Sequence, residues 1–160
     1  MSQPVFHAPD HDHARCSAEA LAHAEKLCAA RSQRLTPVRR QVLESLLDSH
    51  KPLGAYDLIE RTARDGVRHA PITIYRALDF LRDQGFVHRI ESRNAFVACG
   101  HNHASGEMVV FLICEHCGAV GEAPSRDVAV SLAAAARSAG FVAKAPVIEI
   151  SGQCSHCRDS

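Results

Sequence analysis

The sequence predicts an α+β protein, with helices in the first half and a smaller mixed region of strands and one helix after them. Apolar residues recur at helical spacing from about residue 17 to residue 84, whereas short alternating or continuous apolar runs follow from residue 86 onward. Four cysteines in two Cys-x-x-Cys pairs lie in the last third of the chain. With 160 residues, 46% of them hydrophobic, the chain can form one domain or two small ones.

The first half predicts a winged helix-turn-helix. Helices are expected at about residues 17–30, 37–48, 55–64 and 72–84. Thr36-Pro37 is typical of a helix start, because threonine caps the first turn and proline lacks only an N–H that has no partner there. Residues 86–91 and 96–99 read as two strands joined by a turn at 92–94, with Phe86, His88 and Ile90 on one side. Helices followed by a hairpin outline a winged helix-turn-helix.

The second half predicts a small α/β domain after a flexible hinge. Strands are expected at 108–113, 119–122 and 141–150, with Pro146 marking an edge or bulge. A helix is expected at 125–139, with Val128, Leu132 and Ala136 facing inward. The predicted organisation is a tail at residues 1–14, a winged-helix domain at 15–99, a hinge at 100–106 and a second domain at 107–160.

The N-terminal tail is polar and contains His7, His11 and His13. We expect it to be disordered, with transient metal capture as the alternative. The tail has no apolar signal region, and the chain has no run of 18 apolar residues. The sequence therefore predicts a cytoplasmic protein that does not enter the membrane.

The two cysteine pairs, Cys114/Cys117 and Cys154/Cys157, predict a structural zinc site. Two intervening residues let both sulfurs of a pair reach one ion, and two pairs supply a closed shell of four thiolates. The 36 residues between the pairs predict a subdomain that brings them together. Two disulfides or free thiols are the alternative, although cysteines of a chain that is not exported are more often ligands or reactive thiols.

A second group of metal donors lies around the predicted hinge. Imidazole, thiolate and carboxylate suit zinc, with less stability than four thiolates and with a dependence on protonation. A single histidine is usually a solvated side chain, but several donors around one hinge favour a metal site. An ion held there would fix the angle between the two domains. The candidate ligands are His88, Cys99, His101, His103 and Glu122.

The charge distribution favours a nucleic-acid partner for the first half. Residues 15–98 carry 14 Lys/Arg and 10 Asp/Glu, although the whole chain is neutral. Arginines can position phosphates, and the exposed N-terminal turns of helix 72–84 could enter a major groove. A solvated basic face is the alternative. The candidate DNA-binding residues are Arg31, Arg34, Arg39, Thr73, Tyr75 and Arg76.

Three motifs in this order resemble the ferric uptake regulator family of bacterial metal-sensing repressors, and in particular its zinc uptake regulator branch. The resemblance covers about residues 17–157. Cys99 stands where this branch has a thiolate ligand, and thiolate favours zinc over ferrous iron. The motifs are Pro71-Ile-Thr-Ile-Tyr-Arg-Ala-Leu-Asp-Phe-Leu81, Gln84-Gly-Phe-Val-His88 and Ile113-Cys-Glu-His-Cys-Gly-Ala-Val120.

The resemblance implies a homodimer that binds palindromic, double-stranded operator DNA when it is loaded with zinc and represses zinc-uptake genes. It implies one structural and one regulatory zinc per chain. Cys114, Cys117, Cys154 and Cys157 match the structural site, and His88, Cys99 and Glu122 match three sensory ligands. For the fourth ligand His103 is favoured over His101, while gapless spacing points nearer Glu107.

Three other functions remain open at this point. A member of the same family could sense iron, manganese or peroxide instead. Cys16 and Cys28 could serve a thiol-redox sensor, although Cys28 falls on an apolar helix face. A zinc hydrolase would need an open coordination position and a general base, and the chain has no His-Glu-x-x-His, nucleophile elbow or phosphate loop. We therefore predict no catalytic residue and no small-molecule substrate beyond the metal ion.

Overall fold

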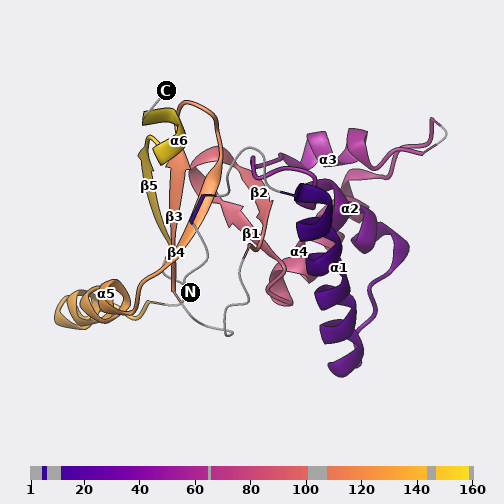
Figure 1. The fold of residues 1–160 in the computed structure, drawn as a ribbon. Coiled ribbons are helices and arrows are strands. Elements are labelled where there is room, and N and C mark those ends of the chain that lie inside the picture. Colours follow the sequence, from indigo (N-terminus) through magenta and orange to yellow (C-terminus); the bar gives the residue numbers. More distant parts are fainter. Residues whose placement is uncertain (1–4, 7–11, 65, 101–107, 144–146, 159–160) are drawn as a thin grey trace. The chain divides into compact units, whose positions relative to one another are not determined.

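Helices and strands combine as the sequence predicts, and the α+β class is confirmed. The computed structural model describes residues 5–6, 12–64, 66–100, 108–143 and 147–158. By its internal contacts the chain divides into two units. One is His7–Gly100, which we call the helical unit, and the other is His101–Ser160 together with Met1–Phe6, which we call the sheet unit (Figure 1).

The helical unit contains four α-helices and a two-stranded antiparallel sheet (Figure 1). Its strands are joined by a short 3-10 turn, η1, and Asn94 ends that turn in the left-handed conformation with φ 45°. This is the predicted winged helix-turn-helix order. The elements are α1 (His13–Ala30), α2 (Pro37–Leu47), α3 (Ala55–Arg61), α4 (Pro71–Asp83), β1 (Val87–Ile90), η1 (Glu91–Arg93) and β2 (Ala95–Ala98).

The helix ends agree with local chemistry, with two differences from the predicted bounds. α2 begins at Pro37 after Thr36, as predicted, although the Thr36 side chain makes no capping hydrogen bond. α1 begins at His13 instead of about residue 17, because the Asp12 carboxylate accepts a hydrogen bond from the Arg15 N–H and caps the helix earlier. α3 ends at Arg61 instead of about residue 64, and the chain then turns back in a bridge between Arg64 and Val67.

The core of the helical unit is made by the apolar stripes that the sequence indicates. α2 and α4 pack against each other and supply most of its fully buried side chains. The hairpin of β1, η1 and β2, which is the wing, joins this core, since Leu53 and Phe96 exchange backbone hydrogen bonds of 2.8 and 2.9 Å. The predicted alternation in the first wing strand is only partly right, because Val87 and Ile90 are buried and His88 is half-buried. The side chains at the centre are Val42, Leu46, Leu58, Ile74, Leu78 and Leu81.

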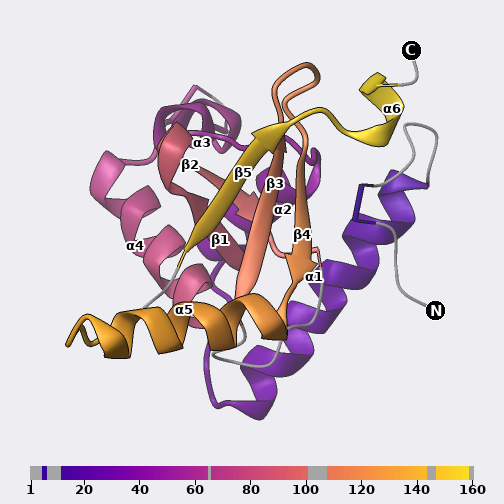
Figure 2. The same cartoon turned by 90° about the vertical axis from the view of Figure 1, so that its left-hand side faces the viewer.

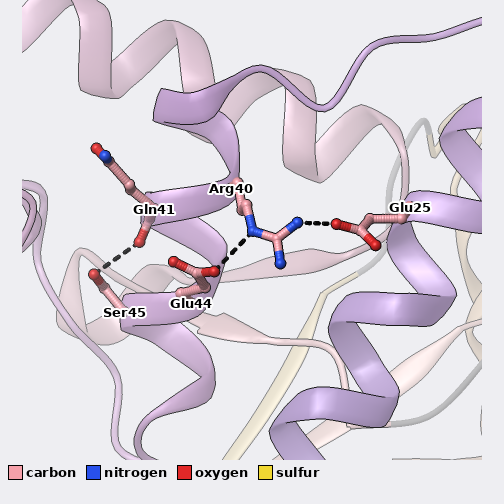
Figure 3. A network of polar contacts seen from close by, with 5 residues as sticks. All are labelled: Glu25, Arg40, Gln41, Glu44 and Ser45. Carbon is pink, nitrogen blue, oxygen red and sulfur yellow. Dashed lines mark hydrogen bonds and ion pairs between the residues drawn. The ribbon is translucent and has the colours of Figure 1, made fainter.

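Polar contacts link α1 to α2 at the edge of this core. The Arg40 guanidinium donates to Glu44 on its own helix at 2.9 Å and also pairs with Glu25 on α1 (Figure 3). On the same helix, the Ser45 hydroxyl donates to the Gln41 carbonyl at 2.8 Å. The sequence places several arginines close together before and within α2. Arg40 is one of them, and its side chain is already paired within the helical unit.

The sheet unit is built on a three-stranded sheet in the order β4-β3-β5 (Figure 2). β3 lies in the middle, antiparallel to β4 and parallel to β5. The unbroken apolar run predicted as a strand is β3, and its short predicted partner is β4. The elements are β3 (Val109–Cys114), β4 (Val120–Pro124), α5 (Arg126–Ser138), β5 (Ile148–Gly152) and α6 (Ser155–Arg158).

Two predictions about the sheet unit are wrong. Val128 and Leu132 on α5 are exposed rather than inward, and Ala136 is only half-buried, because no layer of the described chain covers this helix. The last strand begins at Ile148, so Phe141 to Ala143 lie outside it. The second cysteine pair lies on and just before a short helix, α6, which the sequence did not indicate.

The N-terminal segment contributes to the sheet unit. A Cβ atom added at Gly121 on β4 would lie 2.7 Å from the backbone oxygen and Cγ1 of Val5 and 3.1 Å from the Phe6 ring. Only glycine permits this approach. The tail histidines His7 and His11, the predicted hinge from residue 101 onward and Pro146 lie outside the described residues. No helix among the described residues is long and apolar enough to cross a membrane.

Candidate metal centre

Four cysteines converge at one end of the sheet. Cys114 is the last residue of β3, and Cys117 follows in the turn that leads to β4. Cys154 lies just after β5, and Cys157 is in α6. Because β3 and β5 run parallel as neighbours, their ends bring the two pairs together, and all four sulfur atoms lie within 4.8 Å of one another.

Backbone hydrogen bonds hold these cysteines in place. The Gly118 N–H donates to the Cys114 carbonyl at 2.9 Å, and Gly118 has the positive φ of 78° that closes this tight turn. The Glu115 N–H donates to the Gly152 carbonyl at 2.8 Å, which ties the first turn to the end of β5. The Cys154 N–H points at the Cys114 sulfur at 3.4 Å.

The sulfur geometry fits a tetrahedral metal ion and excludes a disulfide. The Cys117 and Cys154 sulfurs are 3.9 Å apart, whereas a disulfide needs about 2.05 Å. Four sulfurs at about 2.3 Å from a zinc ion would be about 3.8 Å from one another in a regular tetrahedron. All seven cysteines of the chain, each among the described residues, are unbridged. The donor set therefore fits a closed four-thiolate zinc site, as the spacing predicts.

Cys114 and Cys157 differ in how readily they lose a proton. Backbone N–H groups, first that of Cys117 and then that of Cys154, lower the pKa of Cys114 to about 5 against the opposing effect of its burial. Burial, followed by hydrogen bonds with the neighbouring cysteines, raises the pKa of Cys157 to about 12. A metal ion that binds all four sulfurs must displace the Cys157 proton, so its affinity falls as the pH falls.

The second predicted donor group is divided between the two units. In the helical unit, His88 lies on β1 opposite Val97, and Cys99 directly follows β2 with its N–H bonded to the Phe86 carbonyl at 2.8 Å. A ring nitrogen of His88 and the Cys99 sulfur lie within 4.8 Å of each other. In the sheet unit, Glu122 lies on β4 and is buried. His101, His103 and Glu107 lie outside the described residues.

The structure separates the DNA-binding candidates by exposure and by partners. On α4, Tyr75 and Arg76 are exposed and Thr73 is half-buried, so the N-terminal half of this helix presents them outward. Ile72, at the same end of α4, is also exposed. Arg31 and Arg34 are both exposed and Arg39 is half-buried, but only Arg31 and Arg39 donate side-chain hydrogen bonds within the unit.

Fold and site together define a class of protein: a winged helix-turn-helix unit joined to a unit that brings four cysteine sulfurs together. The sequence profile described as the Ferric uptake regulator family matches residues 30–151. The chain belongs to this family, as the sequence motifs predicted.

Individual relatives point to one branch of the family. The chain is 40% identical over 139 residues to the zinc uptake regulation protein of Escherichia coli K12, covering 87% of this chain and 81% of that protein. It is similar in structure to a zinc uptake regulator complexed with zinc and DNA, with a TM-score of 0.83, 39% identity and coverage of 89% and 95% of the two chains. Holo XcZur gives a TM-score of 0.81 at 42% identity, covering 89% of this chain and 99% of that one.

Proposed function

We propose that this protein is a zinc-responsive transcriptional repressor that binds palindromic operator DNA as a zinc-loaded homodimer and controls zinc-uptake genes. The observation that carries the proposal is the His88–Cys99 pair in the hairpin that directly follows α4. These two residues place an imidazole and a thiol together in the unit that presents Tyr75 and Arg76. Similarity to a zinc uptake regulator in complex with zinc and DNA supports the same function.

The ligand chemistry favours zinc over the metals that other members of such a family could sense. Thiolate and imidazole suit zinc, whereas carboxylate and water oxygens suit manganese and magnesium better. We propose that His88 and Cys99 of the helical unit, Glu122 of the sheet unit and a fourth ligand form the sensory site. For the fourth position His103 is favoured, with His101 and Glu107 as alternatives. The four cysteines at the ends of β3 and β5 would hold the structural ion.

The division of the sensory ligands between two units supplies the mechanism. Zinc can contact all of its ligands only in conformations where the two units approach each other, so it shifts the population toward those conformations. The free energy by which zinc strengthens DNA binding equals the difference between its binding free energies for the conformations that bind DNA and for those that do not. In a dimer of that form, the two α4 helices would enter successive major grooves, which matches a palindromic operator.

The exposed apolar side chains of the sheet unit support the homodimer. α5 has no buried residue, and Val130 and Leu132 on it are 67% and 40% exposed. Phe141 and Val142, which follow α5, are 66% and 84% exposed. An amphipathic helix whose apolar stripe is left largely exposed by the described residues needs a partner surface, and we propose that a second copy of the chain provides it.

The sensory assignment can be tested with Cys99→Ser. We expect this variant to keep its structural zinc and its fold but to lose zinc-dependent DNA binding, measured by fluorescence anisotropy over a range of buffered free zinc. Cys16→Ser is the matched control, because it makes the same chemical change on α1 of the same unit, where Cys16 belongs to neither donor group. A Cys99→Ser protein with the zinc response of the wild type would refute the assignment.

A further inference from the structure

Two arginines of the helical unit, Arg31 and Arg39, are engaged with the same helix, α4. The Arg31 guanidinium donates to the Gln84 backbone oxygen at 3.0 Å and to the Gln84 side-chain oxygen at 3.1 Å. The Arg39 guanidinium lies 3.5 Å from the centre of the Phe80 ring and donates to the Arg34 carbonyl at 2.6 Å. Both were predicted DNA contacts, yet the described structure assigns each guanidinium an internal partner.

These contacts join the connection between α1 and α2 to the C-terminal part of α4. Arg31 is the C-cap residue that follows α1, and Gln84 is the C-cap residue that follows α4. The last carbonyls of a helix lack intrahelical donors and carry partial negative charge, so a guanidinium there is favourable. Arg39 lies in the first turn of α2 and rests on Phe80 in the third turn of α4, where a planar cation stacks on an aromatic face.

Arg39 also fixes the segment that leads into α2. Its bond to the Arg34 carbonyl spans five residues, across the Arg34–Thr36 connection. One side chain therefore orders this connection and braces it against α4 at the same time. Lysine could not replace it in both contacts, because an ammonium group has neither the planar face nor the forked donors of a guanidinium.

Arg34 and Arg76 differ from this pair in their partners. Both are exposed, as Arg31 is, but neither side chain has a hydrogen bond or ion pair within the described part of the chain. A guanidinium in this state can reach a phosphate or a base edge without breaking an internal contact. For Arg31 or Arg39 to do so, it would have to give up the contacts that hold α4.

We propose that Arg31 and Arg39 are positioning residues that set the orientation of α4, and that Arg34 makes the phosphate contact in this segment. The proposal rests on the proposed function, in which α4 reads DNA. The two arginines act through Gln84 and Phe80, and the quantity that they control is the angle at which α4 presents Tyr75 and Arg76 to the groove.

Salt dependence distinguishes positioning from phosphate contact. Each phosphate contact contributes close to one unit to the slope of log K against log salt concentration, and a residue that acts at a distance from DNA contributes nothing to it. The experiment compares Arg39→Ala, Arg39→Lys and Arg34→Ala with the zinc-loaded wild type. The probe is a duplex selected by the wild type from a random library, titrated at four salt concentrations.

We expect Arg39→Ala to weaken binding on the order of 10-fold with an unchanged salt slope. Arg39→Lys should be equally weak despite its retained charge. Arg34→Ala should reduce the slope by about one. If Arg39→Ala reduces the slope by about one and Arg39→Lys restores both slope and affinity, Arg39 contacts phosphate and the proposal is wrong. Wild-type affinity for DNA in Arg39→Ala, with only a lower melting temperature, would also overturn it.

A double-mutant cycle with Phe80→Leu tests the route of the effect. If Arg39 acts through the Phe80 ring, Arg39→Ala should weaken DNA binding much less in the Phe80→Leu background than in the wild type. Equal effects in both backgrounds would remove Phe80 from the proposal. The same cycle on urea unfolding needs no DNA. A wild type that binds no DNA would refute the proposed function, whereas absence of coupling in urea would refute the Arg39–Phe80 brace itself.

Discussion

The two units of the chain complete their cores in different ways. In the helical unit, α2 and α4 bury their apolar stripes, and Val42, Leu46, Ile74 and Leu78 are at most 1% exposed. In the sheet unit, β3 is buried, but α5 leaves its apolar residues exposed. The helical unit therefore has a core of its own, whereas the exposed apolar residues of the sheet unit agree with the proposal that it needs a metal ion and a second copy.

Removal of the structural metal should give the largest effect and should be confined to the sheet unit. A structural zinc ion contributes on the order of 10 kcal/mol to the folding of small metal-dependent domains. We expect Cys114→Ser to abolish hydrogen-exchange protection in β3 and β5 while α2 and α4 stay protected. Cys16→Ser controls for the loss of a thiol. Protection of β3 at the wild-type level in the Cys114→Ser protein would show that the sheet unit does not need the ion.

A core truncation in the helical unit should give the next largest effect and the opposite distribution. Leu78 is 1% exposed and belongs to the core between α2 and α4. Leu78→Ala should lower the free energy of unfolding of this unit by about 2–5 kcal/mol, because it removes buried methyl groups and leaves a cavity. Urea unfolding, monitored through the hydrogen-exchange protection of α2, measures this loss of unfolding free energy. The structural zinc content should not change, and zinc loss together with unfolding would mean that the two units do not fold separately.

Loss of a base-reading side chain should have a smaller effect, limited to DNA affinity. Arg76 is exposed on α4, and Arg76→Ala should weaken specific binding by about 1–3 kcal/mol if the guanidinium reaches a guanine edge. The measurement is a titration with a selected duplex and with a scrambled one. Arg137→Ala on α5 is the control. Equal losses on both duplexes would assign Arg76 to the phosphate backbone instead.

Truncation on the uncovered face of α5 should give the smallest of these effects. Leu132→Ala should raise the dimer dissociation constant about 10-fold, or about 1.4 kcal/mol, because one side chain's burial against the partner is lost. Sedimentation velocity over a concentration series measures it. Ala133→Ser, on the neighbouring residue of the same helix, should leave the constant unchanged. If Leu132→Ala also left it unchanged, α5 would not belong to the dimer interface.

Most of the helices and strands could be predicted because the residue patterns that determine them lie within short stretches of the sequence. The stripe of Ile74, Leu78 and Leu81 indicates α4, and the two Cys-x-x-Cys pairs indicate which sulfurs meet. The exposure of Leu132 could not be predicted, since an apolar stripe shows which face seeks cover but not whether the same chain provides it. The exact start of the last strand was also missed, because an apolar run such as Phe141–Val142 does not show whether it pairs or stays exposed.

For the metal and DNA-binding candidates as well, the sequence shows the type of each side chain but not the partner that it meets. Spacing predicted that Cys114, Cys117, Cys154 and Cys157 would meet, because paired cysteines have few other uses, and their sulfurs do lie within 4.8 Å of one another. A count of arginines could not separate Arg34 from Arg31 and Arg39, since charge in a sequence carries no information about internal partners. Only the contacts with Gln84 and Phe80 make that separation.

Whether the sensory ion controls DNA binding is decided by measuring DNA affinity before and after mild chelation of the purified, zinc-loaded protein, with zinc counted in the same samples. We expect chelation to remove one zinc per chain and DNA affinity to be lost with it, while β3 and β5 keep their hydrogen-exchange protection because the four-thiolate ion remains. Readdition of zinc should restore binding. Undiminished DNA affinity after loss of that ion would contradict the account.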